Sequence, residues 1–271
     1  MDAILSNLDA ADNLAAGAAP PSSGFAGLLL DHSRRIIRAA NGFGVYGASW
    51  LRPWVTYCVS PLLNRVAGGR IAQFNDFKVR LGECDLYTFA NIFEDYPVRD
   101  IERALNEVGL IVDLGANVGA FSCLVAALCR RHELDHPIVA VEPNTANVEF
   151  LRQQPFAGAI SIRHAAVGAA NGTARLVRGH NSVSDYVDFS GRAIGETIDV
   201  LSLDSLCDRP ALVKMDIEGG EWSILEHGLP ENVRHLVLEW HRPGGPADLV
   251  PGNWIQISND IHGASMWYLR H

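Results

Sequence analysis

Short apolar segments alternate with helical patterns between residues 110 and 240, and this alternation restricts the fold more than any other feature of the sequence. Most of these segments are apolar at nearly every position, which is typical of strands in a parallel sheet covered on both faces. We therefore predict an α/β fold with a Rossmann-like, mostly parallel sheet. The predicted strands are 110–114, 138–142, 160–164, 212–216 and 235–240, and the predicted helices between them are 119–131, 145–154 and 220–227.

Other patterns surround this core. Alternating apolar residues predict a hairpin within 71–81, and a helix is expected at 98–106. Residues 172–178 and 197–203 are expected to be extended insertions in the third crossover. Residues 254–258 and 265–269 predict a closing hairpin that adds antiparallel strands at the sheet edge. Residues 71–271 are therefore expected to form the main domain.

The first predicted strand runs into a glycine turn with the sequence I-V-D-L-G-A-N-V-G at 111–119. Gly115 permits a tight turn, and Gly119 allows a ligand and the next helix to approach closely. The spacing G-x-x-x-G differs from the G-x-G-x-x-G of dinucleotide enzymes. A nicotinamide oxidoreductase is therefore disfavoured, and a cofactor with an amino-acid tail is favoured, whose ammonium Asp113 or its neighbours could hold.

Acidic residues and one histidine follow three further strands. Glu142, at the tip of the second strand, is placed to accept hydrogen bonds from a ribose diol, although it could instead cap the next helix. Asp216 follows the strand that carries Lys214, and we expect this lysine to meet a carboxylate of the nearby acidic cluster, because a buried charge must be paired. That cluster comprises Asp216, Glu218 and Glu221, and the last strand delivers Glu239 and His241 to the same edge.

These segments together resemble the FkbM family of class I methyltransferases. The stretches D-L-G-A-N-V-G, V-E-P-N, K-M-D-I-E-G-G-E-W and L-E-W-H occur in that order, and the resemblance covers about residues 85–240. It implies S-adenosyl-L-methionine as the cofactor and a sheet of about seven strands. The residues implied or expected to contact the cofactor are Asp113, Gly115, Asn117 and Gly119 at the methionine part, Glu142 at the ribose, a turn at Ala166 and Val167 at the adenine, Tyr96 in a covering segment, and Asp216.

Transfer of a methyl group to a hydroxyl requires that the hydroxyl lose its proton. His241, with an ordinary pKa of ~6.5, suits the role of general base, and Asp216 or Glu239 could orient it or bind the acceptor. We expect O-methylation of a small molecule, a sugar or secondary metabolite as the resemblance implies, without a metal. Two alternatives stay open: a metal-assisted reaction with Asp216, Glu218, Glu239 and His241 as ligands, and a non-catalytic protein that keeps the cofactor fold.

The N-terminal region differs in composition from the rest. Residues 1–26 are predicted to be a flexible tail, and residues 27–70 a helical cap that is basic and aromatic. We favour a solvated face packed on the main domain or on a second subunit, as in a homodimer; a peripheral membrane or lipid-linked contact is the alternative.

The whole chain carries a net charge of −9, which argues against a nucleic-acid partner. The five cysteines include no C-x-x-C pair, and no apolar run is long enough to span a bilayer. The first residues are acidic where a signal peptide would be basic. The expected location is the cytoplasm.

Overall fold

The computed structural model describes residues 68–74, 76–178, 185–259 and 264–270. The predictions of a tail at 1–26 and of nearly all of a cap at 27–70 lie outside these residues. The described chain begins with a short hairpin of β1 (Ile71–Gln73) and β2 (Lys78–Arg80), as the alternation within 71–81 predicted. No helix in the described part of the chain has the length and apolar character to cross a membrane.

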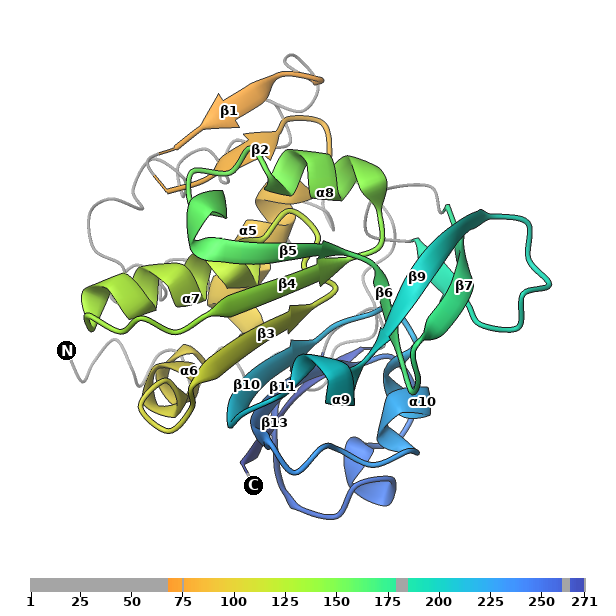
Figure 1. Cartoon of the computed structure of the whole chain (residues 1–271). Helices are drawn as coiled ribbons and strands as arrows, with labels where there is room; N and C mark the ends of the chain where they lie inside the picture. The colour runs from red at the N-terminus through yellow and green to blue at the C-terminus, as the bar shows by residue number, and fades with distance from the viewer. Residues whose placement is uncertain (1–67, 75, 179–184, 260–263, 271) are drawn as a thin grey trace, which may run out of the picture.

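A seven-stranded sheet forms the centre of the molecule, in the order β12-β13-β11-β10-β3-β4-β5 (Figure 1). The strands from β11 to β5 pair in parallel, and β13 is antiparallel to both of its neighbours. The predicted Rossmann-like sheet with a closing antiparallel hairpin is therefore confirmed. The strands are β3 (Leu110–Leu114), β4 (Ile138–Glu142), β5 (Ile160–His164), β10 (Ala211–Met215), β11 (Val233–Trp240), β12 (Asn253–Asn259) and β13 (Ser265–Arg270).

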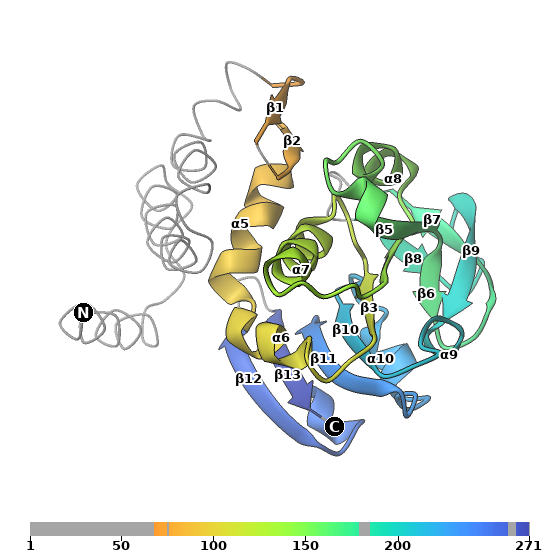
Figure 2. The ribbon, with the colours of Figure 1, turned by 60° about the vertical axis from the view of Figure 1, so that its left-hand side comes forward.

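Helices cover both faces of this sheet (Figure 2). One apolar cluster packs α5, α6, α7 and the end of α8 against one face of the sheet. A second apolar cluster packs α9 and α10 against the opposite face. Because both faces are buried at the centre of the sheet, the central strands β3 and β10 are buried at every position, whereas the strand β5 at the edge alternates. The helices are α5 (Asp85–Asp95), α6 (Val98–Ala104), α7 (Ala120–Arg131), α8 (Thr145–Leu151), α9 (Leu203–Leu206) and α10 (Glu221–Leu225).

A second sheet of four strands, ordered β6-β9-β7-β8, is inserted between β5 and β10 (Figure 1). The expected extended segments at 172–178 and 197–203 correspond to two of its strands. The expected turn at Ala166 and Val167 is wrong, because both residues lie in a strand that pairs in parallel with β9. The strands are β6 (Ala166–Gly168), β7 (Gly172–Val177), β8 (Tyr186–Asp188) and β9 (Glu196–Ser202), and two 3-10 helices, η2 (Ala157–Ala159) and η3 (Pro246–Asp248), complete the described elements.

A buried polar contact joins β11 to β13. Nδ1 of His235 lies 2.6 Å from the hydroxyl of Tyr268, and its Nε2 lies 3.2 Å from Glu107, which also accepts from Arg270. Burial lowers the pKa of His235 below its ordinary value, although the charge of Glu107 acts in the opposite direction. His235 is therefore neutral in the folded protein over a pH range in which it is protonated in the unfolded chain.

This difference predicts a loss of stability in acid. As the pH falls below the unfolded pKa of ~6.5, unfolded His235 gains a proton before folded His235 does, so the free energy of unfolding should fall by up to ~1.4 kcal/mol per pH unit until the folded pKa is reached. Denaturant unfolding between pH 7 and pH 5 measures it. In His235→Gln this part of the loss should vanish, whereas the exposed His227→Gln should behave as wild type; equal slopes for all three proteins would contradict the prediction.

Candidate active site

The glycine turn after β3 is held against the loop that follows β10. Gly115 has a φ of 71°, and a Cβ on it would lie 1.8 Å from the backbone oxygen of Asp216. Gly119 has a φ of 87°, and a Cβ there would lie 2.4 Å from Leu151 and 2.8 Å from Phe156. The close approach expected at Gly119 is thus made by the side chain of Leu151 in α8 and by that of Phe156, which follows α8. Gly115 is the glycine that allows two loops of the site to touch.

The side chain of Lys214 connects the glycine turn with the loop that follows β10. Its Nζ donates to the carbonyl oxygens of Leu114 and Gly115 and lies 3.3 Å from Asp113 and 3.7 Å from Asp216. Burial alone would lower the pKa of Lys214, but the charges of Asp113 and Asp216 outweigh it and raise the pKa. The expected pairing of Lys214 with the acidic cluster is present at Asp216.

Asp113 is the nearer of the two carboxylates that pair with Lys214. It has no exposed surface, and its Oδ2 accepts hydrogen bonds from the backbone and the hydroxyl of Ser122 in α7. Asp113 therefore fixes the lysine and the start of the helix and offers no surface to a ligand in this conformation. Its neighbour Asn117 has a φ of 51°, and its buried Oδ1 accepts no hydrogen bond from the described residues.

Glu142 lies at the end of β4, beside the glycine turn. Its carboxylate accepts from the backbone N–H groups of Asn117, at 2.8 Å, and Asn144, at 3.0 Å, and from the side chain of Asn147. The helix cap of α8 is Asn144, whose side chain accepts from two backbone N–H groups, so Glu142 does not act as the cap. Burial raises the pKa of Glu142, and its hydrogen bonds oppose that rise.

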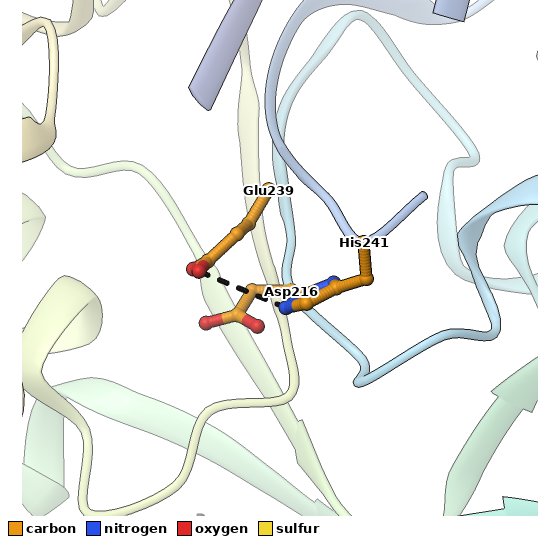
Figure 3. A group of neighbouring side chains, drawn as sticks. All are labelled: Asp216, Glu239 and His241. Carbon is orange, nitrogen blue, oxygen red and sulfur yellow. Dashed lines mark ion pairs between the residues drawn. The ribbon is translucent and has the colours of Figure 1, made fainter. Parts of the chain in front are cut away.

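Asp216, Glu239 and His241 come together at the carboxyl edge of the sheet (Figure 3). Each offers one ligand atom, and these atoms lie within 4.8 Å of one another. Nδ1 of His241 is 2.9 Å from Oε1 of Glu221, which has no exposed surface, and Nε2 is 3.7 Å from both Glu218 and Glu239. The three residues named as catalytic candidates are therefore neighbours. We call Asp216, Glu239 and His241 the acid–histidine cluster.

The carboxylates around this cluster repel one another. Repulsion from Asp216, together with burial, raises the pKa of Glu239. Burial, and to a smaller extent repulsion from Asp216, raises the pKa of Glu218 to about 7. Burial opposes protonation of His241, but its hydrogen bond to Glu221 and the surrounding carboxylates raise its pKa. The assumption of an ordinary pKa for His241 is therefore wrong, because the pKa is raised above that value.

Tyr96 and the β6 residues take different positions relative to this cluster. Tyr96 lines a hollow with Glu239, Ser258 and Ser265, and its ring lies 6.0 Å from that of Phe121 in α7. It thus stands between the helix after the glycine turn and the acid–histidine cluster. The side chains of Ala166 and Val167 are buried in apolar packing. If these residues line an adenine as predicted, they can contact it only through their backbone.

Two features of the site were not identified as site features from the sequence. Glu221 was predicted only to belong to the acidic cluster, without a role of its own. In the structure its Oε1 fixes His241 and also accepts from the backbone N–H groups of Ile217 and Gly219. Arg80 in β2 pairs with buried Asp85 and donates to Asn147, which contacts Glu142. No local pattern marks Arg80 as a site residue, because its link to Glu142 runs through Asn147, which lies in a distant segment of the sequence.

The Methyltransferase FkbM domain family matches residues 113–258, more than half of the chain and the part that holds the glycine turn, Glu142 and the acid–histidine cluster. The chain belongs to the FkbM methyltransferase family. It is accordingly an S-adenosylmethionine-dependent methyltransferase, as the resemblance implied. No curated protein matches the chain.

Solved structures of other methyltransferases are similar to this FkbM methyltransferase at low identity. A methyltransferase FkbM from Methylobacillus flagellatus KT is 17% identical with a TM-score of 0.42, over 82% of this chain and 60% of that one. A putative RNA methyltransferase from Pyrococcus horikoshii is 10% identical with a TM-score of 0.37, over 78% and 96%. The N-terminal domain of human METTL16 in complex with SAH is 10% identical with a TM-score of 0.39, over 85% and 96%. The family assignment depends on the domain match, since every TM-score here is below 0.5.

The contact between Gly115 and Asp216 predicts a large effect of a single methyl group. Gly115→Ala places a Cβ at a positive φ and against a backbone oxygen, so it should lower the free energy of unfolding by more than ~2 kcal/mol or displace the Asp216 loop. Thermal unfolding and binding of S-adenosylhomocysteine measure the two effects. The control is Gly158→Ala, where a Cβ meets no atom within 4 Å, and a Gly115→Ala protein as stable and as competent as this control would refute the contact.

Proposed function

We propose that this FkbM methyltransferase methylates a hydroxyl group of a small molecule, of the sugar or secondary-metabolite class that the family resemblance implies. The observation that carries the proposal is the position of the acid–histidine cluster. It lies at the carboxyl ends of β10 and β11, and the Asp216 loop touches the glycine turn through Gly115. An acceptor bound at the cluster is therefore next to the turn where ligands of such sheets bind.

The residues of the turn fit the cofactor. The orphaned Oδ1 of Asn117 is an acceptor suited to the ammonium of the methionine part, a role that buried Asp113 is not placed to fill directly. Glu142 has used three of about four acceptor positions of its carboxylate, which leaves room for a ribose hydroxyl. When bound, S-adenosylmethionine supplies an activated methyl group on a sulfonium.

The acid–histidine cluster has the task of binding the acceptor and promoting the loss of its hydroxyl proton. Asp216 and Glu239 accept no hydrogen bond from the described residues, so each carboxylate can accept one from a hydroxyl. The hollow beside Glu239 supplies two serines and Tyr96 as further polar groups. Alignment of the acceptor and exclusion of water account for the rest of the rate enhancement.

Location in the cytoplasm belongs to the same proposal. The four cysteines in the described part of the chain are free, and burial raises the pKa of Cys207 to about 12. Buried free thiols of this kind agree with a reducing compartment.

The first test concerns the ribose. Glu142→Ala should weaken binding of S-adenosylhomocysteine by about 2 kcal/mol, ~30-fold, because a charged acceptor is lost. Asn144→Ala is the matched control, since it removes the cap of α8, worth about 1 kcal/mol of stability, and keeps the carboxylate. Calorimetric affinities that fall equally in both variants would show that Glu142 acts only through the fold.

The second test concerns the cluster. His241→Ala should lower kcat by about 10² to 10⁴ while the affinity for S-adenosylhomocysteine stays within about twofold, because the loss falls on the chemical step. The exposed His227→Ala should retain wild-type kcat. A fully active His241→Ala protein would remove the histidine from the reaction.

The acceptor class itself is tested by mass spectrometry. The protein is incubated with S-adenosylmethionine and panels of sugars, phenols, aliphatic alcohols, amines and RNA, and each product is searched for the gain of one CH₂. The proposal expects the gain on oxygen of an uncharged small molecule. Methylation found only on nitrogen or only on RNA would overturn it.

A further inference from the structure

The acid–histidine cluster combines donor types that metal ions use. Asp216 follows β10, and Glu239 and His241 lie at the end of the neighbouring parallel strand β11, so one carboxylate oxygen from each acid and one imidazole nitrogen converge within 4.8 Å (Figure 3). The side chains of Asp216, Glu239 and His241 are 26%, 27% and 19% exposed. They are open to a small ligand on one side and fixed by the sheet on the other.

The histidine is oriented as metal ligands are. Its Nδ1 lies 2.9 Å from Oε1 of Glu221, and two backbone N–H groups fix that same oxygen. Nδ1 therefore carries a proton directed at Glu221, and Nε2 points to the side where Glu239 lies 3.7 Å away. A ligating histidine almost always donates its other N–H to a carboxylate or carbonyl in this way.

The carboxylates lack the donors that ordinarily satisfy such groups. Among the described residues, nothing donates a hydrogen bond to Asp216 or Glu239, and the cationic partner of Asp216, Lys214, lies 3.7 Å away and is shared with Asp113. Fully buried Glu221, which holds His241, keeps a second oxygen, Oε2, with no hydrogen-bond partner in the described chain. Four carboxyl groups lie around one histidine, and a divalent cation bound among them would favour their ionised forms.

We infer that Asp216, Glu239 and His241 bind one divalent cation, and that this cation holds the hydroxyl oxygen of the acceptor. Two oxygen donors and one nitrogen donor suit Mn²⁺ and related ions, which accept both, and three protein ligands leave coordination positions open. Glu221 is a positioning residue in this site, because it acts on the cation through His241.

The inference rests on the proposed O-methylation and specifies how the proton is removed. A hydroxyl bound to a divalent cation is more acidic than in water. Its O–H bond breaks and the proton passes to solvent; the oxygen lone pair then forms the O–CH₃ bond, and the S–CH₃ electron pair stays on sulfur. The products are a methyl ether, S-adenosylhomocysteine and one proton.

Metal binding can be tested without turnover. The full chain, treated with a chelator and then dialysed, is titrated with MnCl₂, and bound Mn²⁺ is measured by calorimetry and electron paramagnetic resonance. We expect one Mn²⁺ per chain, with a nitrogen coupling in the pulsed spectrum that His241→Gln removes. Glu239→Gln and Asp216→Asn should weaken binding at least ~10-fold, and Glu221→Gln by ~10- to 100-fold.

The control variant is Glu226→Gln, which removes an exposed acid at the end of α10 and should bind Mn²⁺ as wild type does. Failure of the wild-type protein to bind Mn²⁺, or equal binding by wild type, Glu239→Gln and Asp216→Asn, overturns the site. Equal methylation of a hydroxyl acceptor with Mn²⁺ and with EDTA overturns the role of the cation and leaves the proposed function intact. Specific Mn²⁺ binding with methylation only of amines or RNA supports the site and overturns O-methylation.

Discussion

The buried ammonium of Lys214 is the interaction on which the arrangement of the site depends. Four oxygens surround it: the carbonyls of Leu114 and Gly115 and the carboxylates of Asp113 and Asp216. Three of them belong to the glycine turn or the end of its strand, and the fourth belongs to Asp216 of the acid–histidine cluster. Removing one partner from a buried ion pair of this kind typically costs about 3–5 kcal/mol, because the remaining charge stays buried. The ammonium of Lys214 thus sets the distance between the glycine turn and the acid–histidine cluster.

The sheet was predictable because its strands are buried on both faces. The predicted bounds of β3, β4 and β5 agree with the structure at every residue. β3 and β4 are short, largely apolar runs, whereas β5 alternates between apolar and polar residues. Helix α5 was missed, although Leu86, Phe89 and Ile92 recur at near-helical spacing and are buried. Its first residue follows Cys84, which provides no side-chain cap, so the usual start signal is absent.

The site was predictable where chemistry follows a strand end. Asp216, Glu239 and His241 could be brought together from the sequence because parallel strands deliver their carboxyl ends to one edge. The pairings within the site were not predictable, because they depend on distances between segments. Asp113 was expected to face the cofactor and instead holds Lys214 and Ser122, and the pKa of His241 is set by Glu221, twenty positions earlier in the sequence. Residue type and strand position were enough to predict the cluster. The pKa shifts of its members could not be predicted, because they depend on contacts that only the fold creates.

The order of strands in the central sheet has a consequence for synthesis of the chain. Strand β13 is the last strand of the sheet in the sequence, yet it lies between β11 and β12 and pairs with both. On a ribosome, β11 would therefore emerge with one backbone edge unpaired, and β12 would have no partner in the central sheet until residues 265–270 had been translated. An exposed strand edge is prone to pair with other chains. Translation of residues 265–270 is therefore needed before this edge of β11 can be paired.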